Sequence, residues 1–152
     1  MILFLDFDGV THPQFPRDDL TDEENKDFSF APRLEAVLRD FPDVKVVISS
    51  AWRQRHTLAQ LRGFFAPDIA ERIVGVTPVE QTNPAYKPFP VRGIRSREAR
   101  AWLNETGQPN TKWIALEDNG WNWLATDPVI LCDDGFHEAE EAALRAALQA
   151  MQ

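Results

Sequence analysis

The sequence ILFLDFDGV at residues 2–10 is the most informative part of the chain. Its apolar start predicts a short buried strand that ends at the carboxylate of Asp6. Side chains alternate along an extended chain, so Asp6 and Asp8 lie on the same side and point at one spot. Two close negative charges are costly unless they share a cation, and carboxylate oxygens suit Mg²⁺. The alternative interpretation is a polar strand end followed by a turn at Gly9.

Outward from this stretch, apolar runs alternate with segments of helical periodicity. This alternation is typical of an α/β fold with a mostly parallel sheet, and the chain length of 152 residues fits a single domain over 1–152. Residues 78–93 hold several prolines and no periodicity, which predicts a loop. The predicted strands are 2–6, 44–49, 72–76, 113–116 and 129–132, and the predicted helices are 30–41, 58–65, 96–106 and 138–151.

Residues 10–29 form an irregular acidic segment with two prolines between the first strand and the first helix. The segment directly follows the carboxyl end of the strand, where open α/β sheets bind their ligands. We interpret it as a solvated flap or short insertion over the site. It is too short to form a separate cap domain, because domains start at about 50 residues.

Composition and charge exclude several classes of protein. Acidic residues outnumber basic ones by 24 to 16, and this net charge of −8 argues against a protein that coats nucleic acid non-specifically. One cysteine, Cys132, and three histidines are too few for an internal disulfide or a structural zinc site. The N-terminus lacks the basic region of a signal peptide, and no apolar stretch reaches the ~18 residues of a membrane span. We therefore expect a cytoplasmic protein without a membrane partner.

Polar groups also follow two other predicted strands. The second strand ends at Ser49 and Ser50, whose hydroxyls, with the amides of a following helix, suit a phosphate oxygen. A serine here can equally be an ordinary helix N-cap. The fourth strand ends in Glu117 and Asp118, which can bind a metal or simply form a turn.

A run of four arginines leads into the predicted helix 96–106. A guanidinium group there could reach a phosphate held at the strand ends. The alternative is a solvated helix face. The run consists of Arg92, Arg95, Arg97 and Arg100.

The polar groups described above occur in a fixed order along the chain: an acid pair, a hydroxyl, a cation and a second acid pair. This order is typical of the haloacid dehalogenase-like (HAD) superfamily. The sequence resembles this superfamily along nearly its whole length, most specifically in DFDGV at 6–10. SSAWR at 49–53 and AWL at 101–103 resemble the small HAD domains grouped with RNA-repair proteins. The resemblance implies a three-layer, Rossmann-like parallel sheet of about five strands with a minimal cap.

The resemblance also implies a Mg²⁺-dependent phosphatase and assigns its acidic residues. Asp6 would attack phosphorus and become an aspartyl-phosphate, and Asp8 would protonate the leaving group and later activate water. Asp118, with Glu117 beside it, would complete the metal site formed with Asp6 and the backbone carbonyl of Asp8. Many relatives have two aspartates where this chain has Glu117 and Asp118, so the chain departs from the pattern at Glu117.

The phosphate-binding residues implied by the resemblance have competitors in this chain. Ser49 would bond the phosphoryl oxygens, with Ser50 as the alternative hydroxyl. The family's cation is usually a lysine. The spacing in this chain instead points to Arg95, with Arg97 next, while Lys87 before a proline is a third candidate. The substrate would be a small phosphorylated molecule, a phosphoprotein loop or an exposed phosphorylated polymer end, so nucleic acid would enter only as a substrate.

Two other functions remain as alternatives. A receiver-type signalling domain also carries a phosphorylated aspartate, at the end of its third strand. The third predicted strand of this chain ends at Val76 and Thr77 and offers no acid there. The other alternative is a phosphate-binding module that has lost catalysis.

The remaining histidines and tryptophans are predicted to be structural. Trp52 and Trp123 are expected to pack in the core or at its rim rather than stack on a base. His12, His56 and His137 lack metal-ligand spacing and are expected in turns or on the surface, and Trp102, Trp113 and Trp121 are expected in the core.

Overall fold

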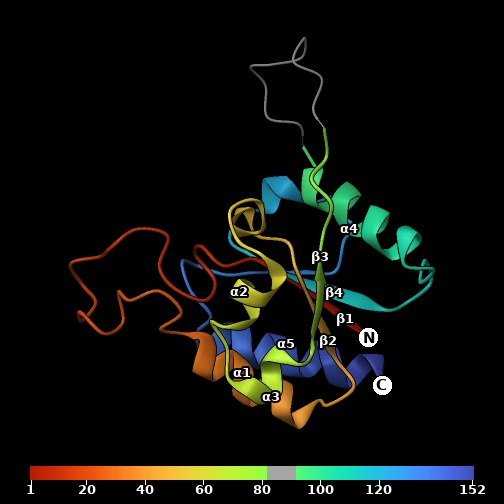
Figure 1. Ribbon diagram of the computed structural model, residues 1–152. Coiled ribbons are helices and arrows are strands. Elements are labelled where there is room, and N and C mark those ends of the chain that lie inside the picture. Colours follow the sequence, from red (N-terminus) through yellow and green to blue (C-terminus); the bar gives the residue numbers. More distant parts are fainter. Residues whose placement is uncertain (82–91) are drawn as a thin grey trace.

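The computed structural model describes residues 1–81 and 92–152, which fold around one five-stranded sheet (Figure 1). The strand order is β3-β2-β1-β4-β5, and every neighbouring pair is parallel. The prediction of an α/β fold with a parallel sheet is confirmed. The strands are β1 (Ile2–Leu5), β2 (Lys45–Ile48), β3 (Ile73–Val76), β4 (Trp113–Glu117) and β5 (Val129–Leu131).

The central strand, β1, explains why the sequence starts with a continuous apolar run. Leu5 lies opposite Ile48 of β2 and Leu116 of β4. All four residues of β1 are buried, because neighbouring strands flank it and helices cover both faces of the sheet. The strand ends at Leu5, one residue before the predicted end, so Asp6 is the first residue beyond it.

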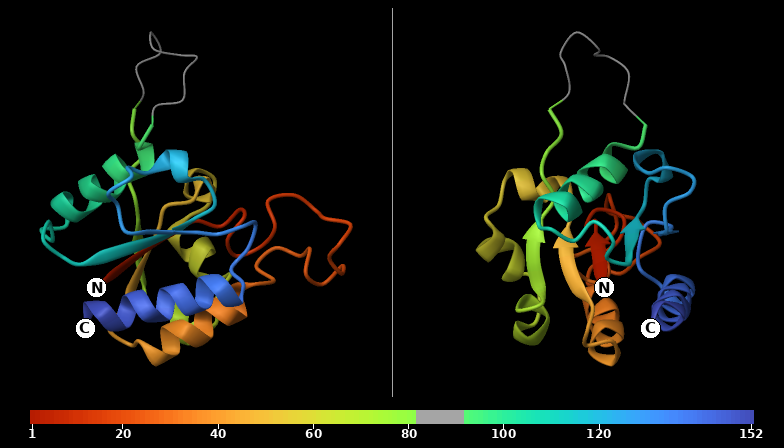
Figure 2. Two further views of the ribbon diagram at one scale, coloured as in Figure 1. Left: turned by 180° about the vertical axis from the view of Figure 1, so that it is seen from behind. Right: turned by 90° about the vertical axis from the view of Figure 1, so that its right-hand side faces the viewer.

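Helices lie on both faces of this sheet and make the three predicted layers. Helices α1, α3 and α5 cover one face, and α4 covers the other (Figures 1 and 2). The elements are α1 (Ala31–Asp40), η1 (Ala51–Gln54), α2 (Leu58–Arg62), α3 (Pro67–Ala70), α4 (Ile94–Glu105), η3 (Gly120–Asn122) and α5 (Glu138–Met151), of which η1 and η3 are 3₁₀-helices. None of the helices that the structure describes is long and apolar enough to cross a membrane.

The two faces of the sheet bury separate apolar clusters. Leu3 and Leu5 of β1 pack with α1 and α5, whereas Phe4 packs with Trp102 of α4 and with Trp123. Trp121 was predicted in the core and is instead 49% exposed, because it lies on the short helix η3 at the surface.

Helix boundaries differ from the prediction after β2. The helix predicted over 58–65 ends at Arg62, with Gly63 as its C-cap, and Pro67 then starts the separate helix α3. Four residues are too few to show a helical period in the sequence, which is why α3 was not predicted. The start of α2 is well defined, since Thr57 and Gln60 form a capping box.

The segment 10–29 contains no helix and projects from one side of the molecule (left in Figure 1). Its base is closed by a hydrogen bond of 2.8 Å from Phe30 N–H to the Thr11 carbonyl. Further out, the Gln14 N–H donates to a carboxylate oxygen of Asp134, at 2.8 Å, in the loop after β5. The insertion is therefore attached to the body beside the carboxyl ends of the strands.

Candidate active site

Polar side chains gather where the strand order changes direction. The chain runs from β1 outward to β2 and β3, and then crosses to β4 on the other side of β1. Open α/β sheets bind ligands at the carboxyl ends of the strands at such a switch point. The pocket at this position is lined by Asp6, Asp8, Gln14, Ala51, Arg95, Glu117, Asp118, Asn119 and Asn122. The structure thus brings both predicted acid pairs and one arginine to a single pocket.

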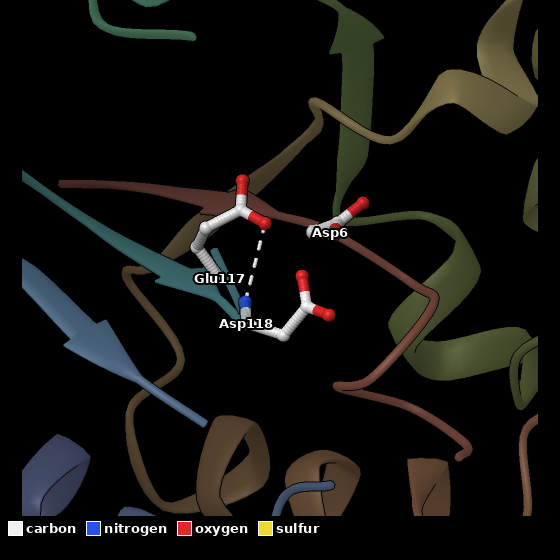
Figure 3. A group of neighbouring side chains, drawn as sticks. All are labelled: Asp6, Glu117 and Asp118. Atoms are coloured by element: carbon white, nitrogen blue, oxygen red, sulfur yellow. Dashed lines mark hydrogen bonds between the residues drawn. The ribbon is translucent and has the colours of Figure 1, made fainter. Parts of the chain in front are cut away.

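Three of these residues, Asp6, Glu117 and Asp118, form a carboxylate cluster. One oxygen of each lies within 4.8 Å of the others. Figure 3 shows the three side chains gathered at the ends of β1 and β4. A donor set of carboxylate oxygens alone suits a hard cation such as Mg²⁺. These residues therefore fit the metal that the resemblance implies.

Glu117 is the most enclosed member of the carboxylate cluster. Its Oε1 accepts hydrogen bonds from the backbone N–H groups of Asp118 (3.2 Å) and Asn119 (3.3 Å), and its Oε2 accepts one from the Trp123 indole (3.1 Å). Burial, followed by the negative charge of Asp6, raises the pKa of Glu117 to about 9. Burial also raises the pKa of Asp6. A cation bound here would favour the ionised carboxylates.

Gly9 allows the backbone to pass close to this cluster. Its φ of 73° lies in the left-handed region. A Cβ atom at this position would come within 2.7 Å of Cγ of Asp118. The glycine after Asp8 is thus required both by the turn and by the space that the Asp118 side chain occupies.

Asp8 is held by two ring donors that the sequence analysis did not assign to the site. The Trp52 indole Nε1–H donates to both carboxylate oxygens, at 3.2 and 3.1 Å, and His12 Nε2 lies 3.0 Å from Oδ1. His12 was predicted as a turn or surface residue. It follows the turn at 9–11 and forms an isolated bridge with Asp8, and it is only 3% exposed, so it is not a surface residue. No local pattern signals this contact, because it depends on the path of the turn.

The two serines after β2 have different surroundings. Ser50 Oγ accepts the Trp52 N–H at 3.3 Å and caps η1, as the N-cap interpretation anticipates. Ser49 Oγ is buried and has no hydrogen-bond partner among the residues that the structure describes. An unpartnered buried hydroxyl is costly, so Ser49 retains hydrogen-bonding capacity at the end of β2.

The basic candidates are separated by the structure. Arg95 lines the pocket and donates to Glu98 at 2.8 Å. Arg97 binds Glu80 with two guanidinium nitrogens and is absent from the pocket lining in the described part of the chain. Lys87 lies outside the residues that the structure describes.

Arg53 is a further residue near the site, and its role was not predicted. Its guanidinium and the Glu98 carboxylate, both 1% exposed, form an ion pair at 2.9 Å. The same guanidinium donates to the backbone carbonyls of Ser49, Ser50 and Thr77. Arg53 thus joins the ends of β2 and β3 to α4, and it shares the Glu98 carboxylate with Arg95. The sequence signal was SSAWR itself, in which the arginine follows the strand end.

A comparison with known families decides the assignment. The model of the family described as the HAD domain in Swiss Army Knife RNA repair proteins matches residues 2–140. The chain belongs to this family. No curated protein and no solved structure matches it. The superfamily and the subgroup predicted from DFDGV and SSAWR are therefore confirmed.

Membership supports a hydrolase of the HAD type, and HAD domains generally use Mg²⁺. This HAD domain also differs from a receiver-type domain in topology. Receivers have the strand order 2-1-3-4-5, whereas the order here is 3-2-1-4-5. Both observations speak against the receiver alternative.

Proposed function

We propose that this HAD domain is a Mg²⁺-dependent phosphatase that hydrolyses phosphate monoesters through an aspartyl-phosphate on Asp6. One observation carries the proposal. The Asp6 carboxylate belongs to the cluster with Glu117 and Asp118 and shares its pocket with Asp8 and Arg95. A nucleophile, an acid–base group, a cation and metal ligands are therefore within one site.

The reaction would proceed in two steps. An oxygen of Asp6 attacks phosphorus, the bond from phosphorus to the leaving oxygen breaks, and Asp8 gives its proton to that oxygen. Asp8 then takes a proton from a water molecule, which attacks the aspartyl-phosphate and releases inorganic phosphate. Asp6 and Asp8 return to their starting states.

Phosphate monoesters are among the slowest compounds to hydrolyse without a catalyst, so neutralisation of charge in the transition state has to supply much of the rate acceleration. Asp6, Glu117 and Asp118 would hold Mg²⁺, which would neutralise charge on the phosphoryl oxygens when bound. Arg95 adds a second positive charge at the pocket. The Ser49 hydroxyl, which has no partner among the described residues, is suited to a phosphoryl oxygen although Ser49 does not line the pocket in the described part of the chain.

For the substrate we infer a phosphorylated RNA end. The family description names RNA repair proteins, which supports this class. The insertion at 10–29 is too short to enclose the pocket as a domain would, so a polymer end can enter. The net charge of −8 disfavours contact with a long nucleic acid and is compatible with recognition of the terminal phosphate alone.

The test is a phosphate-release assay with and without Mg²⁺. The substrates are p-nitrophenyl phosphate, nucleoside monophosphates and oligoribonucleotides that carry a 3′- or 5′-phosphate. We expect turnover that requires Mg²⁺ and disappears in Asp6→Asn, whose amide cannot attack phosphorus although its volume is unchanged.

Circular dichroism and the melting temperature of Asp6→Asn should match or exceed those of the wild type. Substantial activity in this variant contradicts the nucleophile assignment. A folded wild type that binds phosphate but turns over none of the substrates supports the phosphate-binding module instead.

A further inference from the structure

Asp8 has a side chain that would rotate freely without its two donors. The side chain is 41% exposed and follows the end of β1, so packing alone does not hold it. Oδ1 receives hydrogen bonds from both rings, with His12 Nε2 at 3.0 Å and Trp52 Nε1 at 3.2 Å. Oδ2 also accepts from Trp52 Nε1–H, at 3.1 Å. The Trp52 indole thus bridges both oxygens and His12 adds a second contact to Oδ1, so the two rings set the orientation of the carboxyl group.

The tautomer of His12 follows from its other nitrogen. Nδ1 lies 3.1 Å from both the Phe28 backbone N–H and the Thr11 hydroxyl. The hydroxyl can donate or accept, but the backbone N–H can only donate, so Nδ1 is an acceptor without a proton. The proton of the neutral ring is therefore on Nε2, where it points at Asp8 Oδ1. His12 is held in the orientation in which it donates to the carboxylate.

Phe28 is itself fixed in an unusual conformation at the end of the insertion. Its φ of 61° lies in the left-handed region, which a bulky residue rarely adopts. Its ring stacks on that of Phe64, with 4.5 Å between the ring centroids. It packs edge-on against Phe7 and Trp52, with centroid separations of 5.0 and 5.4 Å. These contacts hold the strained backbone and direct its N–H at His12.

We propose that His12 and Trp52 are positioning residues for the acid–base reaction at Asp8, and that Phe28 orients His12 for this role. Together they hold the carboxyl group in one orientation for proton transfer to and from the substrate. The inference rests on the proposed phosphatase function and adds to it the residues that direct proton transfer.

The test uses the dependence of the rate on the leaving group. The aryl ester p-nitrophenyl phosphate releases a stable phenolate and needs little acid assistance, whereas the alkyl ester glycerol 2-phosphate needs a proton on its leaving oxygen. Trp52→Phe keeps a ring and removes the donor. His12→Asn keeps an acceptor for Phe28 but cannot reach Asp8, and His12→Gln restores a donor near the position of Nε2.

We expect kcat for the alkyl ester to fall about tenfold to a hundredfold in Trp52→Phe and His12→Asn, which is part of the roughly 10²–10⁴-fold that general acid catalysis contributes. For the aryl ester, kcat should change less than about threefold, and His12→Gln should recover most of the loss. His56→Gln is the matched control, because His56 stacks on Trp52 at 5.2 Å without touching Asp8, and it should leave both rates unchanged.

A double-mutant cycle separates positioning from a packing role. In an Asp8→Asn background, Trp52→Phe should have no further effect on either ester, because there is no acid left to position. Equal losses on both esters, or the same loss in the Asp8→Asn background, would overturn the proposal.

The activity of the wild type distinguishes failure of the proposed function from failure of the positioning role. A wild type that releases phosphate from neither ester nor any of the nucleotides and oligoribonucleotides overturns the proposed function. A wild type active on the aryl ester alone, or active variants with unchanged leaving-group dependence, overturns only the role of His12 and Trp52. Melting temperatures identify any variant that has not folded, and the two positions provide independent tests.

Discussion

At the scale of single residues, Glu117 illustrates how one methylene group changes a site. Its longer side chain places the carboxyl group against the Trp123 indole and the backbone amides of Asp118 and Asn119. The same reach leaves the group buried beside Asp6, which raises the pKa of Glu117 to about 9. The departure from the family pattern therefore has a physical consequence, a proton that Glu117 retains on folding.

The pH dependence of stability should reveal this proton. Between the ordinary pKa of 4.5 and about 9, the folded protein keeps a proton on Glu117 that the unfolded chain loses. The free energy of unfolding in EDTA should therefore fall as pH rises through this window, by about 1.4 kcal/mol per pH unit for one proton. Urea unfolding at several pH values should show a smaller slope for Glu117→Gln, which cannot titrate. Parallel pH profiles for the two proteins would contradict this assignment.

Gly9→Ala should lower both stability and metal binding. The backbone conformation costs about 1–3 kcal/mol for a residue with a Cβ, and the new methyl group would displace Asp118. Gly107→Ala is a matched control, since Gly107 has a similar φ of 72° but open space around its Cβ position. Chemical unfolding with and without Mg²⁺ checks the pair. Both variants should lose stability, and the stabilisation by Mg²⁺ should shrink only in Gly9→Ala. Equal Mg²⁺ stabilisation in the two variants would show that Asp118 does not depend on Gly9.

At the scale of elements, the position of each arginine along the first turns of α4 decides whether its side chain points toward the pocket. Arg95 and Glu98 are three residues apart and lie on one side of the helix, toward Arg53 and the pocket. Arg97 points elsewhere and pairs with Glu80. The phase of the helix therefore decides which arginine of the run lines the pocket.

Removal of charge from Glu98 should be far more costly than removal from Glu80. Glu98→Gln leaves the buried guanidinium of Arg53 without its counter-charge, which should cost about 3–5 kcal/mol. Glu80→Gln breaks a pair whose side chains are 34% and 40% exposed, so solvent limits the loss to about 1 kcal/mol or less. Urea unfolding of both variants measures the difference. Similar small losses in the two would show that the Arg53–Glu98 pair does not hold α4 on the sheet.

At the scale of the whole molecule, the carboxylate cluster joins segments that are more than a hundred residues apart in the sequence. Asp6 follows β1, whereas Glu117 and Asp118 stand at the end of β4. A cation that binds only the folded protein stabilises it, because the unfolded chain has no such cluster.

Mg²⁺ should accordingly raise the melting temperature of the wild type. At a hundred times Kd the stabilisation is about 2.7 kcal/mol. Asp118→Ala should show a much smaller shift, because one ligand of the cluster is missing. Asp133→Ala is the control, since Asp133 lines a neighbouring pocket with Asp118 but lies outside the cluster. Thermal scans over a Mg²⁺ series give the comparison. Equal shifts in Asp118→Ala and the wild type would remove Asp118 from the metal site.

Most of the fold could be predicted because its signals are local. Short apolar runs and helical periodicity identified all five strands and four of the α-helices, with ends that match or differ by at most three residues. Helix α3 was missed because a single turn has no period. Acidic residues at the ends of β1 and β4 were predicted to meet, since parallel strands share one carboxyl edge.

The sequence by itself therefore determined the α/β class, the parallel sheet and the position of Asp6, Asp8, Glu117 and Asp118 at its edge. Only the tertiary structure decided the partners of these groups. His12 and Trp52 reach Asp8 from 4 and 44 residues away, and Arg53 reaches Glu98 across 45 residues. The physical reason is that periodicity records which face of an element is buried, whereas a side-chain hydrogen bond depends on loop paths and helix phase, which are set when the elements pack.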